Sequence, residues 1–398
     1  MGRTLENLEQ FGIDVVLGRR RGFRAALLRG VLFALSLLYE RIVQLRLYFY
    51  RKRILRERTL GCLVISIGNL TVGGTGKTPV VEKFARALQS GGRRVAILSR
   101  GYKSVPKPTK KTWIDRLFSK NVDPPRIVSD GQFVLLDSVT AGDEPHMLAR
   151  NLKDVIVLVD KDRVKSGRYA IDNWKVDTLL LDDGLQYLHL NHRLDIVLVD
   201  RQQPFGNEFL LPRGMLREPP RNLRRASYIF ITKNTGEPND KLIERIRRYN
   251  RTAEIIECAH RPLYLQNIYT GERLGLERLR GAFIGSICGI AAPESFEGAL
   301  KKLGANVNLG LRFIDHHYYT DAELRGFMNR CIRRDLAMII TTEKDAVRMP
   351  ELPIAEVKVP IYFMRVEIDI VTGHESWEHC VNRICRPQPM LSPERFFA

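Results

Sequence analysis

The sequence predicts an α/β fold, with a mostly parallel β-sheet covered by helices on both faces and a smaller second α/β domain after it. Short, nearly continuous apolar runs rich in β-branched residues recur along the chain, as expected of strands that are buried on both faces. Segments with apolar residues at helical spacing lie between several of these runs. The 398 residues are enough for two domains of ordinary size, each with its own hydrophobic core.

The composition is that of a globular protein with an unusually large positive charge. Apolar residues make up 44% of the chain and charged residues 27%, which excludes an intrinsically disordered protein. The 64 basic and 45 acidic residues leave a net charge of +19, and such an excess predicts an anionic partner: nucleic acid, anionic lipid or a phosphorylated substrate. The six cysteines have no C-x-x-C spacing, so we expect reduced thiols of a cytosolic protein and no zinc site.

Residues 1–58 form the first predicted unit, a basic amphipathic helix region. Between Arg19 and Arg58 there are twelve Arg or Lys residues, and apolar residues recur every three or four positions, which is typical of a helix lying in a membrane interface. The apolar run at 31–39 covers nine residues, whereas roughly 20 are needed to span a bilayer. A helix that docks on the protein's own core is the alternative, and both arrangements can hold together. The apolar stripe consists of Leu27, Val31, Leu35, Leu38, Ile42, Leu45 and Phe49.

A glycine-rich loop between a strand and a helix is the central feature of the next unit. The apolar run at 63–67 predicts the strand, and apolar residues at helical spacing over 80–88 predict the helix. Glycines between them let backbone N–H groups point at a polyphosphate at the positive end of the helix. Lys77 would reach the terminal phosphates of a nucleoside triphosphate, and the Thr78 hydroxyl would bind Mg²⁺. The loop residues are Thr71, Val72, Gly73, Gly74, Thr75, Gly76, Lys77 and Thr78.

This loop departs from the strict G-x-x-x-x-G-K-[ST] pattern, because Thr71 occupies the position of the first glycine. A glycine-rich turn before an ordinary helix is therefore the alternative. The strand before it, the helix after it and three glycines within four positions favour the phosphate-binding interpretation. We accordingly predict a P-loop NTPase-type core domain over residues 59–257.

Acidic residues follow three of the predicted strands of this domain. Apolar runs at 94–99, 155–159, 178–181, 195–199 and 228–232 predict parallel strands, and ligands of such sheets bind beyond the carboxyl ends of the strands. Asp160, Asp200 and the doublet Asp182-Asp183 each end one of these runs. The doublet is the best candidate for Mg²⁺, since adjacent carboxylates before a glycine can bind the ion and position a second group. A helix cap or a solvated turn is the alternative for each.

Three further segments of the core domain carry charges. Asp143 and Glu144 precede a helical pattern, where the helix dipole favours carboxylates. Residues 103–126 are rich in Lys and Pro and predict a surface excursion, either a second basic contact or a variable loop. The run 210–220 predicts a rigid loop with paired charges at its centre.

After residue 257 the sequence predicts a hairpin linker and then the second α/β domain. Strand-like pieces at 263–269 and 273–276 flank a Thr-Gly-Glu turn, which places the linker at 258–280. Strands at 282–288 and 337–342 and a helix at 295–303 predict the second domain over residues 281–398. His316 and His317 lack a matched set of metal ligands, so we expect an acid–base or orienting role beside Asp315 and no metal site there.

Seven motifs, in this order, resemble those of the tetraacyldisaccharide 4′-kinase family, the lipid A 4′-kinases of Gram-negative bacteria. The resemblance extends from about Arg20 to Arg348, and Thr71 belongs to the family's own version of the loop. The motifs are Gly68-Asn69-Leu70-Thr71 with Gly73 to Pro79, Ser99-Arg100-Gly101-Tyr102, Gly142 to Pro145, Asp182 to Gln186, Leu216-Arg217-Glu218-Pro219, Asp315-His316, and Thr342-Glu343-Lys344-Asp345-Ala346-Val347.

This resemblance implies a lipid kinase. ATP, with Mg²⁺, would give its γ-phosphate to the 4′-hydroxyl of a tetraacylated glucosamine disaccharide 1-phosphate, forming lipid IVA in lipopolysaccharide biosynthesis. The enzyme would be peripheral on the cytoplasmic face of the inner membrane, and its partners would be the lipid substrate and the anionic membrane surface. Neither nucleic acid nor an obligate protein partner is expected.

The resemblance also implies roles for individual residues. Asp143 matches the proposed catalytic base, and His316 matches the histidine that acts with it. The chain departs from the family at Leu185-Gln186-Tyr187, where an aromatic residue and a histidine are usual, so no role is carried over to Tyr187. The predicted catalytic residues are Asp143, His316, Lys77 and Glu218, and the predicted metal ligands are Thr78, Asp182 and Asp183.

These residue types suit phosphoryl transfer to a sugar. A hydroxyl is a poor nucleophile, so a carboxylate such as Asp143 must accept its proton, and a histidine can orient that carboxylate. Lys77, Mg²⁺ and Arg100 would offset the charge on the phosphoryl oxygens. The competing hypothesis is an ATP-driven switch whose basic regions bind DNA or a protein, which Tyr48 and Tyr50 keep open. It predicts ATPase activity without lipid and salt-dependent DNA binding.

Overall fold

The structure is a computed structural model that describes residues 11–12, 14–16, 18–101 and 123–386. Tyr102, residues 103–122 of the predicted excursion and the tail after Arg386 lie outside the described residues. The strands are β1 (Leu63–Asn69), β2 (Val95–Ser99), β3 (Arg126–Asp130), β4 (Ile156–Val159), β5 (Thr178–Asp182), β6 (Leu194–Asp200), β7 (Tyr228–Thr232), β8 (Glu254–Asn267), β9 (Arg273–Leu274), β10 (Phe283–Cys288), β11 (Asn306–Arg312), β12 (Met338–Thr342) and β13 (Ile361–Thr372).

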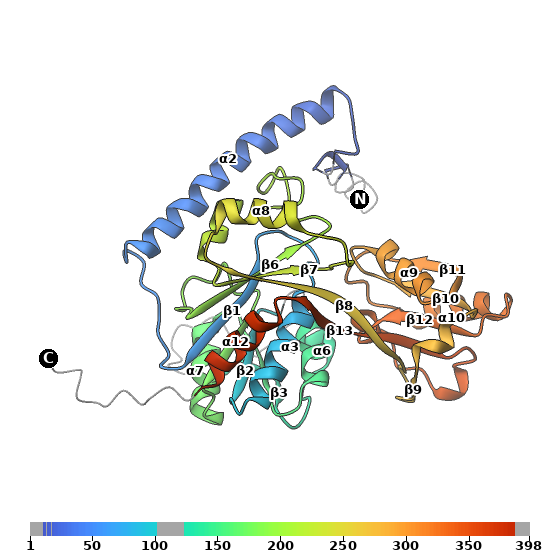
Figure 1. Ribbon diagram of the computed structural model, residues 1–398. Coiled ribbons are helices and arrows are strands. Elements are labelled where there is room, and N and C mark those ends of the chain that lie inside the picture. Colours follow the sequence, from blue (N-terminus) through green and yellow to red (C-terminus); the bar gives the residue numbers. More distant parts are fainter. Residues whose placement is uncertain (1–10, 13, 17, 102–122, 387–398) are drawn as a thin grey trace, which may run out of the picture.

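Helices cover this framework (Figure 1). The α-helices are α2 (Phe23–Arg51), α3 (Lys77–Ser90), α5 (Ser138–Ala141), α6 (Asp143–Asn151), α7 (Arg163–Trp174), α8 (Asp240–Tyr249), α9 (Pro293–Lys302), α10 (Asp321–Ile332), α11 (Glu343–Ala346) and α12 (His374–Cys385). Short 3₁₀ turns are η1 (Pro220–Arg225), η2 (Leu276–Leu279) and η3 (Ile354–Glu356).

The strands of the described part form one 13-stranded sheet, in the order β11-β10-β12-β13-β8-β7-β6-β1-β5-β2-β4-β3, with β9 paired to β8. Within the segment β7-β6-β1-β5-β2-β4 of this order, each strand is parallel to its neighbours. The edge strand β3 is antiparallel to β4. The predicted α/β fold with a mostly parallel sheet is therefore confirmed. All five strands predicted between residues 94 and 232 are present, each within one residue of its predicted ends.

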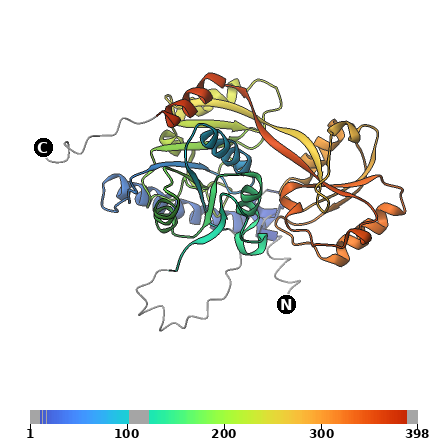
Figure 2. The same ribbon diagram turned by 90° about the horizontal axis from the view of Figure 1, so that it is seen from below.

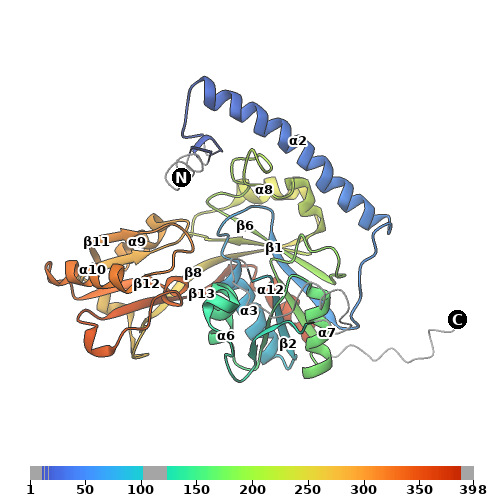
Figure 3. The same ribbon diagram turned by 180° about the vertical axis from the view of Figure 1, so that it is seen from behind.

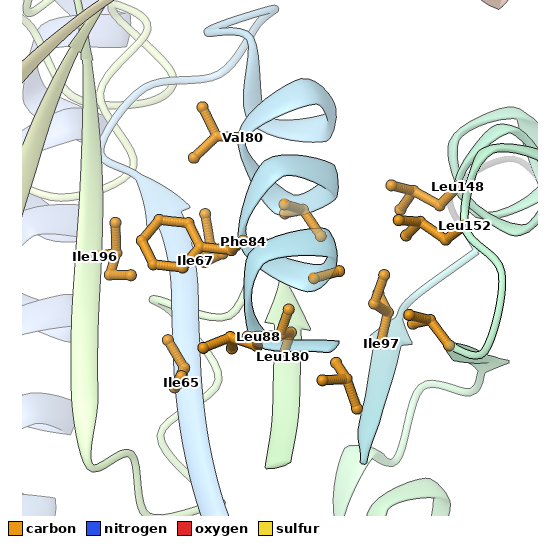
Figure 4. Close-up of a cluster of buried hydrophobic side chains, with 14 of the residues drawn as sticks. Ile65, Ile67, Val80, Phe84, Leu88, Ile97, Leu148, Leu152, Leu180 and Ile196 are labelled. Carbon is orange, nitrogen blue, oxygen red and sulfur yellow. The ribbon is translucent and has the colours of Figure 1, made fainter. Parts of the chain in front are cut away.

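Packing of α3 against the sheet places the glycine-rich loop. Figure 4 shows Phe84 and Leu88 of α3 lying over Ile65 and Ile67 of β1. All four side chains are fully buried, as the helical spacing over 80–88 predicts. In the same cluster, Leu148 of α6 and Leu152, the residue that follows this helix, lie next to Ile97 of β2. The two helices that begin at Lys77 and Asp143 are thus held on one face of the sheet.

The C-terminal part of the chain extends the same sheet at its other end. Figure 2 shows β8 and β13 side by side, running from the core into the orange C-terminal strands. β8 is parallel to β7, antiparallel to β13, and forms the predicted hairpin with β9. The predicted linker boundary at residue 258 lies inside β8, which is continuous from Glu254 to Asn267.

The chain returns to the core after β13, which the sequence analysis did not predict. Arg365, Glu367 and Asp369 interrupt the apolar pattern of this strand, so it does not read as a buried strand. The following helix α12 packs on α3, and the Trp377 ring lies 4.6 Å from that of Phe84, centroid to centroid. Residues near the end of the chain therefore cover the helix that follows the glycine-rich loop.

Helix α2 lies along one side of the molecule, as Figures 1 and 3 show. It contacts the body through a mixed face, on which Ala25 and Ser36 are buried. The Tyr39 hydroxyl donates to the Arg217 carbonyl at 3.1 Å, and Glu40 pairs with Arg221 at 2.6 Å. Six of the seven residues of the predicted apolar stripe face outward, with Leu27 61% and Ile42 57% exposed, whereas Phe49 is half-buried. Among the described helices, none has the length and apolar content needed to cross a bilayer.

Candidate active site

The glycine-rich loop connects β1 to α3, as predicted. Gly73 and Gly76 have φ angles of 117° and 77°, in the region that disfavours side chains. A Cβ on Gly76 would also lie 2.9 Å from Cε1 of His260, so only glycine fits there. Thr75 Oγ1 is buried without a partner among the described residues. Because this loop ends at the N-terminus of a 14-residue helix, its environment favours an anion.

Lys77 is anchored at the base of the loop. Its Nζ donates to Asn69 Oδ1 at 3.2 Å and lies 3.5 Å from Asp183 Oδ1. Asn69 in turn donates to the Thr71 carbonyl at 2.9 Å, and Arg217 donates to Asn69 Oδ1. The ammonium group is thus held at the position where the phosphates of a nucleotide would meet the loop.

The acidic doublet lies at the carboxyl end of β5, beside β1. Asp182 is buried, and its Oδ2 accepts a hydrogen bond from Ser99 Oγ at 3.1 Å. Its Oδ1 has no partner among the described residues. Burial, followed by the negative charges of Glu144 and Asp183, raises the pKa of Asp182 to about 7. A carboxylate in this state suits a cation, which would supply the missing partner.

Asp183 is the ion-paired member of the doublet. Both of its carboxylate oxygens accept from Arg217, each at 2.8 Å. Burial opposes ionisation, but the hydrogen bonds from Arg217 and the charge of Lys77 outweigh it and hold the pKa of Asp183 well below its usual range. The described residues contain no cluster of three or more His, Cys, Asp or Glu side chains that could hold a metal. Mg²⁺ commonly takes only one or two carboxylates and completes its shell with water and phosphate oxygens, so the doublet with Thr78 fits that ion.

The other two acidic candidates are neutralised by lysines. Asp160 pairs with Lys165, and Asp200 pairs with Lys233 at 2.5 Å. These ion pairs favour Asp182, whose Oδ1 has no partner among the described residues, over Asp160 and Asp200 as a cation ligand.

Asp143 and His316 are in direct contact although 173 residues separate them in the sequence. Asp143 is the first residue of α6, where Gly142 caps the helix with a φ of 91°. His316 Nδ1 lies 2.9 Å from Asp143 Oδ2, and Arg348 Nε donates to the same oxygen at 2.8 Å. Burial opposes ionisation of Asp143, but the hydrogen bond from His316 and the charge of Arg348 outweigh it and lower its pKa. Asp143 is therefore a carboxylate throughout the neutral pH range.

Lysine and tyrosine side chains complete the surroundings of this pair. Lys344 Nζ lies 3.3 Å from His316 Nε2 and 3.6 Å from Glu144. The Tyr318 hydroxyl donates to Asp143 Oδ1 at 3.3 Å. Lys344 lies in a motif that the sequence analysis singled out, whereas Tyr318 and Arg348 stood in no pattern that indicated a contact with Asp143.

Glu218 lies apart from both groups. Its carboxylate is buried and accepts from Gln186 Nε2 at 3.1 Å, Asn222 Nδ2 at 2.7 Å and Arg225 at 2.7 Å. Gln186 Nε2 also donates to the Asn69 carbonyl at 3.1 Å, which connects Glu218 to the base of the loop. In the described part of the chain, no hydrogen bond or ion pair joins Glu218 to Lys77 or to Asp143.

A buried ionic network connects the helix of the loop with the elements around Asp143. Arg365 of β13 pairs with Glu82 of α3 and with Glu343 of α11, the latter at 2.7 Å. Asn151, the last residue of α6, donates to Glu343 at 2.7 Å and to Glu82 at 3.3 Å. Because Lys344 follows Glu343 directly, this network holds the C-terminal elements against both α3 and α6.

Three comparisons place these observations among known proteins. A family model described as LpxK, tetraacyldisaccharide-1-P 4′-kinase, matches residues 28–386. A tetraacyldisaccharide 4′-kinase of Syntrophus aciditrophicus (strain SB) is 38% identical over 356 residues, which are 87% of this chain and 90% of that protein. One of Anaeromyxobacter sp. (strain K) is 36% identical over 388 residues, covering 96% of this chain and 98% of that protein. The crystal structure of "apo" form LpxK from Aquifex aeolicus in complex with ATP has a TM-score of 0.68 and 28% identity, and the match covers 90% of this chain and 99% of that one.

Proposed function

The chain belongs to the tetraacyldisaccharide 4′-kinase family, and from this premise we propose that it transfers the γ-phosphate of ATP to the 4′-hydroxyl of a tetraacylated glucosamine disaccharide 1-phosphate. The product is lipid IVA, an intermediate of lipid A biosynthesis. The observation that carries this function is the match of the family model over residues 28–386, which includes the loop, the doublet and both members of the Asp143–His316 pair.

Asp143 is the general base of this proposal. It is ionised, buried and held by His316 at 2.9 Å, so a hydroxyl that reaches it can give up its proton as the bond to phosphorus forms. His316 orients the carboxylate through Nδ1, and Lys344 lies beside Nε2, the other ring nitrogen of His316. Proton removal by a positioned base of this kind contributes roughly 10²–10⁴-fold to a rate.

The nucleotide lies on the loop from Thr71 to Thr78. Backbone N–H groups at the start of α3 and the Lys77 ammonium group bind its phosphates. Thr78, Asp182 and Asp183 would hold Mg²⁺, which would supply positive charge to offset that of the phosphates. The contacts of Glu218 with Gln186 and Arg225 support a role in positioning the base of the loop.

We assign the kinase core to residues 59–257, the hairpin linker to 258–280 and a smaller α/β domain to 281–398. His316 and Lys344 come from the smaller domain and Asp143 from the core, so the Asp143–His316 contact lies between the two. Their closure over the substrates would exclude water from the phosphoryl group. The long paired strands β8 and β13 are the connection across which such closure would occur.

We propose that helix α2 holds the enzyme on the cytoplasmic face of the inner membrane. Most of its apolar stripe is exposed, while a mixed face with Ala25, Ser36 and Tyr39 contacts the body, so the stripe is left accessible to a lipid surface. The arginines around this stripe would meet the anionic lipid surface. Lipid substrate and membrane are then the expected partners, with no nucleic acid and no obligate protein partner.

We expect replacement of two stripe residues by acids to release the protein from membranes. Leu38→Glu with Ile42→Glu changes side chains that are 58% and 57% exposed, so the fold should persist while apolar burial in the lipid is lost. Since a fully buried Leu or Ile contributes about 1.5–3 kcal/mol, co-flotation with anionic vesicles should fall at least about tenfold.

Ile354→Glu is the control for this experiment, because Ile354 is 65% exposed in η3, outside α2. The control should float like the parent protein. Unchanged flotation of the double variant would contradict the membrane role of the stripe.

The function itself is tested by transfer of ³²P from γ-labelled ATP to purified tetraacyldisaccharide 1-phosphate in detergent. Label on the lipid that requires both enzyme and Mg²⁺ is the expected result. ATP hydrolysis that is independent of lipid, with no labelled lipid, would instead favour the ATP-driven switch.

A further inference from the structure

The two oxygens of the Asp143 carboxylate have unequal surroundings. Oδ2 accepts two short hydrogen bonds, from His316 Nδ1 at 2.9 Å and from Arg348 Nε at 2.8 Å. Oδ1 accepts only the longer bond from the Tyr318 hydroxyl, at 3.3 Å, among the described residues. Charge-assisted donors occupy the lone pairs of Oδ2, so Oδ1 is the oxygen that remains able to take a proton.

Arg348 is itself held rigidly in the interior. Its side chain is 0% exposed, and Nη1 donates to the Gly289 carbonyl at 3.2 Å and to Asp345 Oδ1 at 3.3 Å. Asp345 is fixed in turn by the Tyr319 hydroxyl at 2.9 Å and by the Gly289 N–H at 3.0 Å. One buried guanidinium thus bridges two carboxylates, Asp143 from α6 and Asp345 from α11. Its planar fork can do this, whereas an ammonium group offers no such geometry.

Resting on the proposed function, we propose that Arg348 is a positioning residue for the catalytic base: with His316 it holds Asp143 Oδ2, so that Oδ1 receives the proton of the acceptor's 4′-hydroxyl. As the bond between the 4′-oxygen and the γ-phosphorus forms, the bond from that phosphorus to the bridging oxygen breaks and its electron pair leaves with ADP. The hydroxyl proton passes to Oδ1 in the same step and is later released to solvent. Arg348 touches neither substrate in this scheme.

This arrangement makes the rate of phosphoryl transfer depend on pH through the protonation of Asp143. The groups that face Asp143 from the C-terminal part of the chain are cationic or donate hydrogen bonds. Those close to Asp143 in the sequence include both acidic and basic side chains. Arg348 is the closest permanent cation, and loss of an opposite charge at such a distance typically raises a carboxyl pKa by about 1–3 units. The remaining charged and titratable groups around it are His316, Tyr318, Lys344, Asp345, Glu144, His146 and Asp137.

The test is kcat for lipid phosphorylation against pH, at saturating ATP, Mg²⁺ and acceptor. Arg348→Met should move the acid limb of this profile upward by about 1–3 pH units and lower kcat near pH 7, with KM for ATP little changed. Arg348→Lys keeps the charge but cannot bridge both carboxylates, so kcat should fall about tenfold or more while the acid limb moves less than in Arg348→Met. Because Arg348→Lys retains the buried charge, this variant still tests the inference if Arg348→Met does not fold.

Tyr269→Phe is the matched control, since it removes the hydrogen bond from the Tyr269 hydroxyl to the Pro350 carbonyl without touching Asp143, Arg348 or Asp345. Its acid limb should coincide with that of the parent enzyme. A folded Arg348→Met with an unmoved limb, or Arg348→Lys with the parent kcat at every pH, would overturn the inference.

Asp143→Asn in the same assay separates this inference from the proposed function. If that variant keeps the parent kcat, Asp143 is not the base and the proposed mechanism fails, whatever Arg348 does. If that variant is inactive while both Arg348 variants match the parent enzyme, the role of Arg348 alone is refuted.

Discussion

Replacement of Asp143 by Asn is expected to lower kcat for phosphorylation of the lipid acceptor by about 10²–10⁴-fold. The amide keeps the shape of the side chain and can still accept from His316 and Arg348, but it cannot take the proton of the 4′-hydroxyl. The doublet and the glycine-rich loop are untouched, so ATP binding should remain close to that of the parent enzyme. The measurement is ³²P transfer to the lipid, together with calorimetric binding of ATP.

Asp172→Asn, an equivalent change at an exposed position of α7, is the control and should retain full activity. Full turnover by Asp143→Asn would remove this residue as the base.

The dependence of the stability of the fold on pH has a defined sign, because the pKa of Asp143 is lowered in the folded protein. Its ionised form stabilises the fold above the ordinary carboxyl pKa, and this contribution is lost as the pH falls towards the lowered value.

Replacement of Lys77 by Ala is expected to lower the rate of phosphoryl transfer by at least about 10²–10³-fold, the usual cost of removing one preorganised donor to a charged transition state. The ammonium group is held by Asn69 at 3.2 Å, so its position does not have to be created during the reaction. ATP affinity should fall as well, because the same group meets the phosphates in the ground state.

Lys83→Ala on the same helix is the matched control. Lys83 Nζ lies over the Trp377 ring, 5.7 Å from its centroid, and takes no part in the loop. Its removal should leave both transfer and ATP binding near the parent values. Comparable losses in the two variants would mean that the charge of α3, and not the position of Lys77, is what matters.

The local elements could be predicted from the sequence because each depends on nearby residues. Continuous apolar runs and helical spacing identified β1, α3 and the strands β2, β4, β5, β6 and β7, whereas β3 was not predicted. The glycine-rich loop followed from its position between a strand and a helix. The roles given to Asp143 and His316 came from the resemblance to a family, because no local pattern distinguishes a base from a helix-terminal carboxylate.

Tertiary structure decided which of these residues meet. The sequence offered Asp160, Asp200 and the doublet as candidates and favoured the doublet, and only the folded chain shows that Lys165 and Lys233 pair with the first two. Strand order, which local periodicity does not encode, brings β13 beside β8 and so places Arg365 between Glu82 and Glu343. The buried Arg348 is the clearest case, since an arginine in a short charged segment resembles any solvated residue until folding aligns it with Asp143, 205 positions earlier. Sequence therefore determined the elements and the chemistry that they carry. The assembly of the sheet decided which distant charges pair, because such contacts depend on the order of strands that are far apart in the chain.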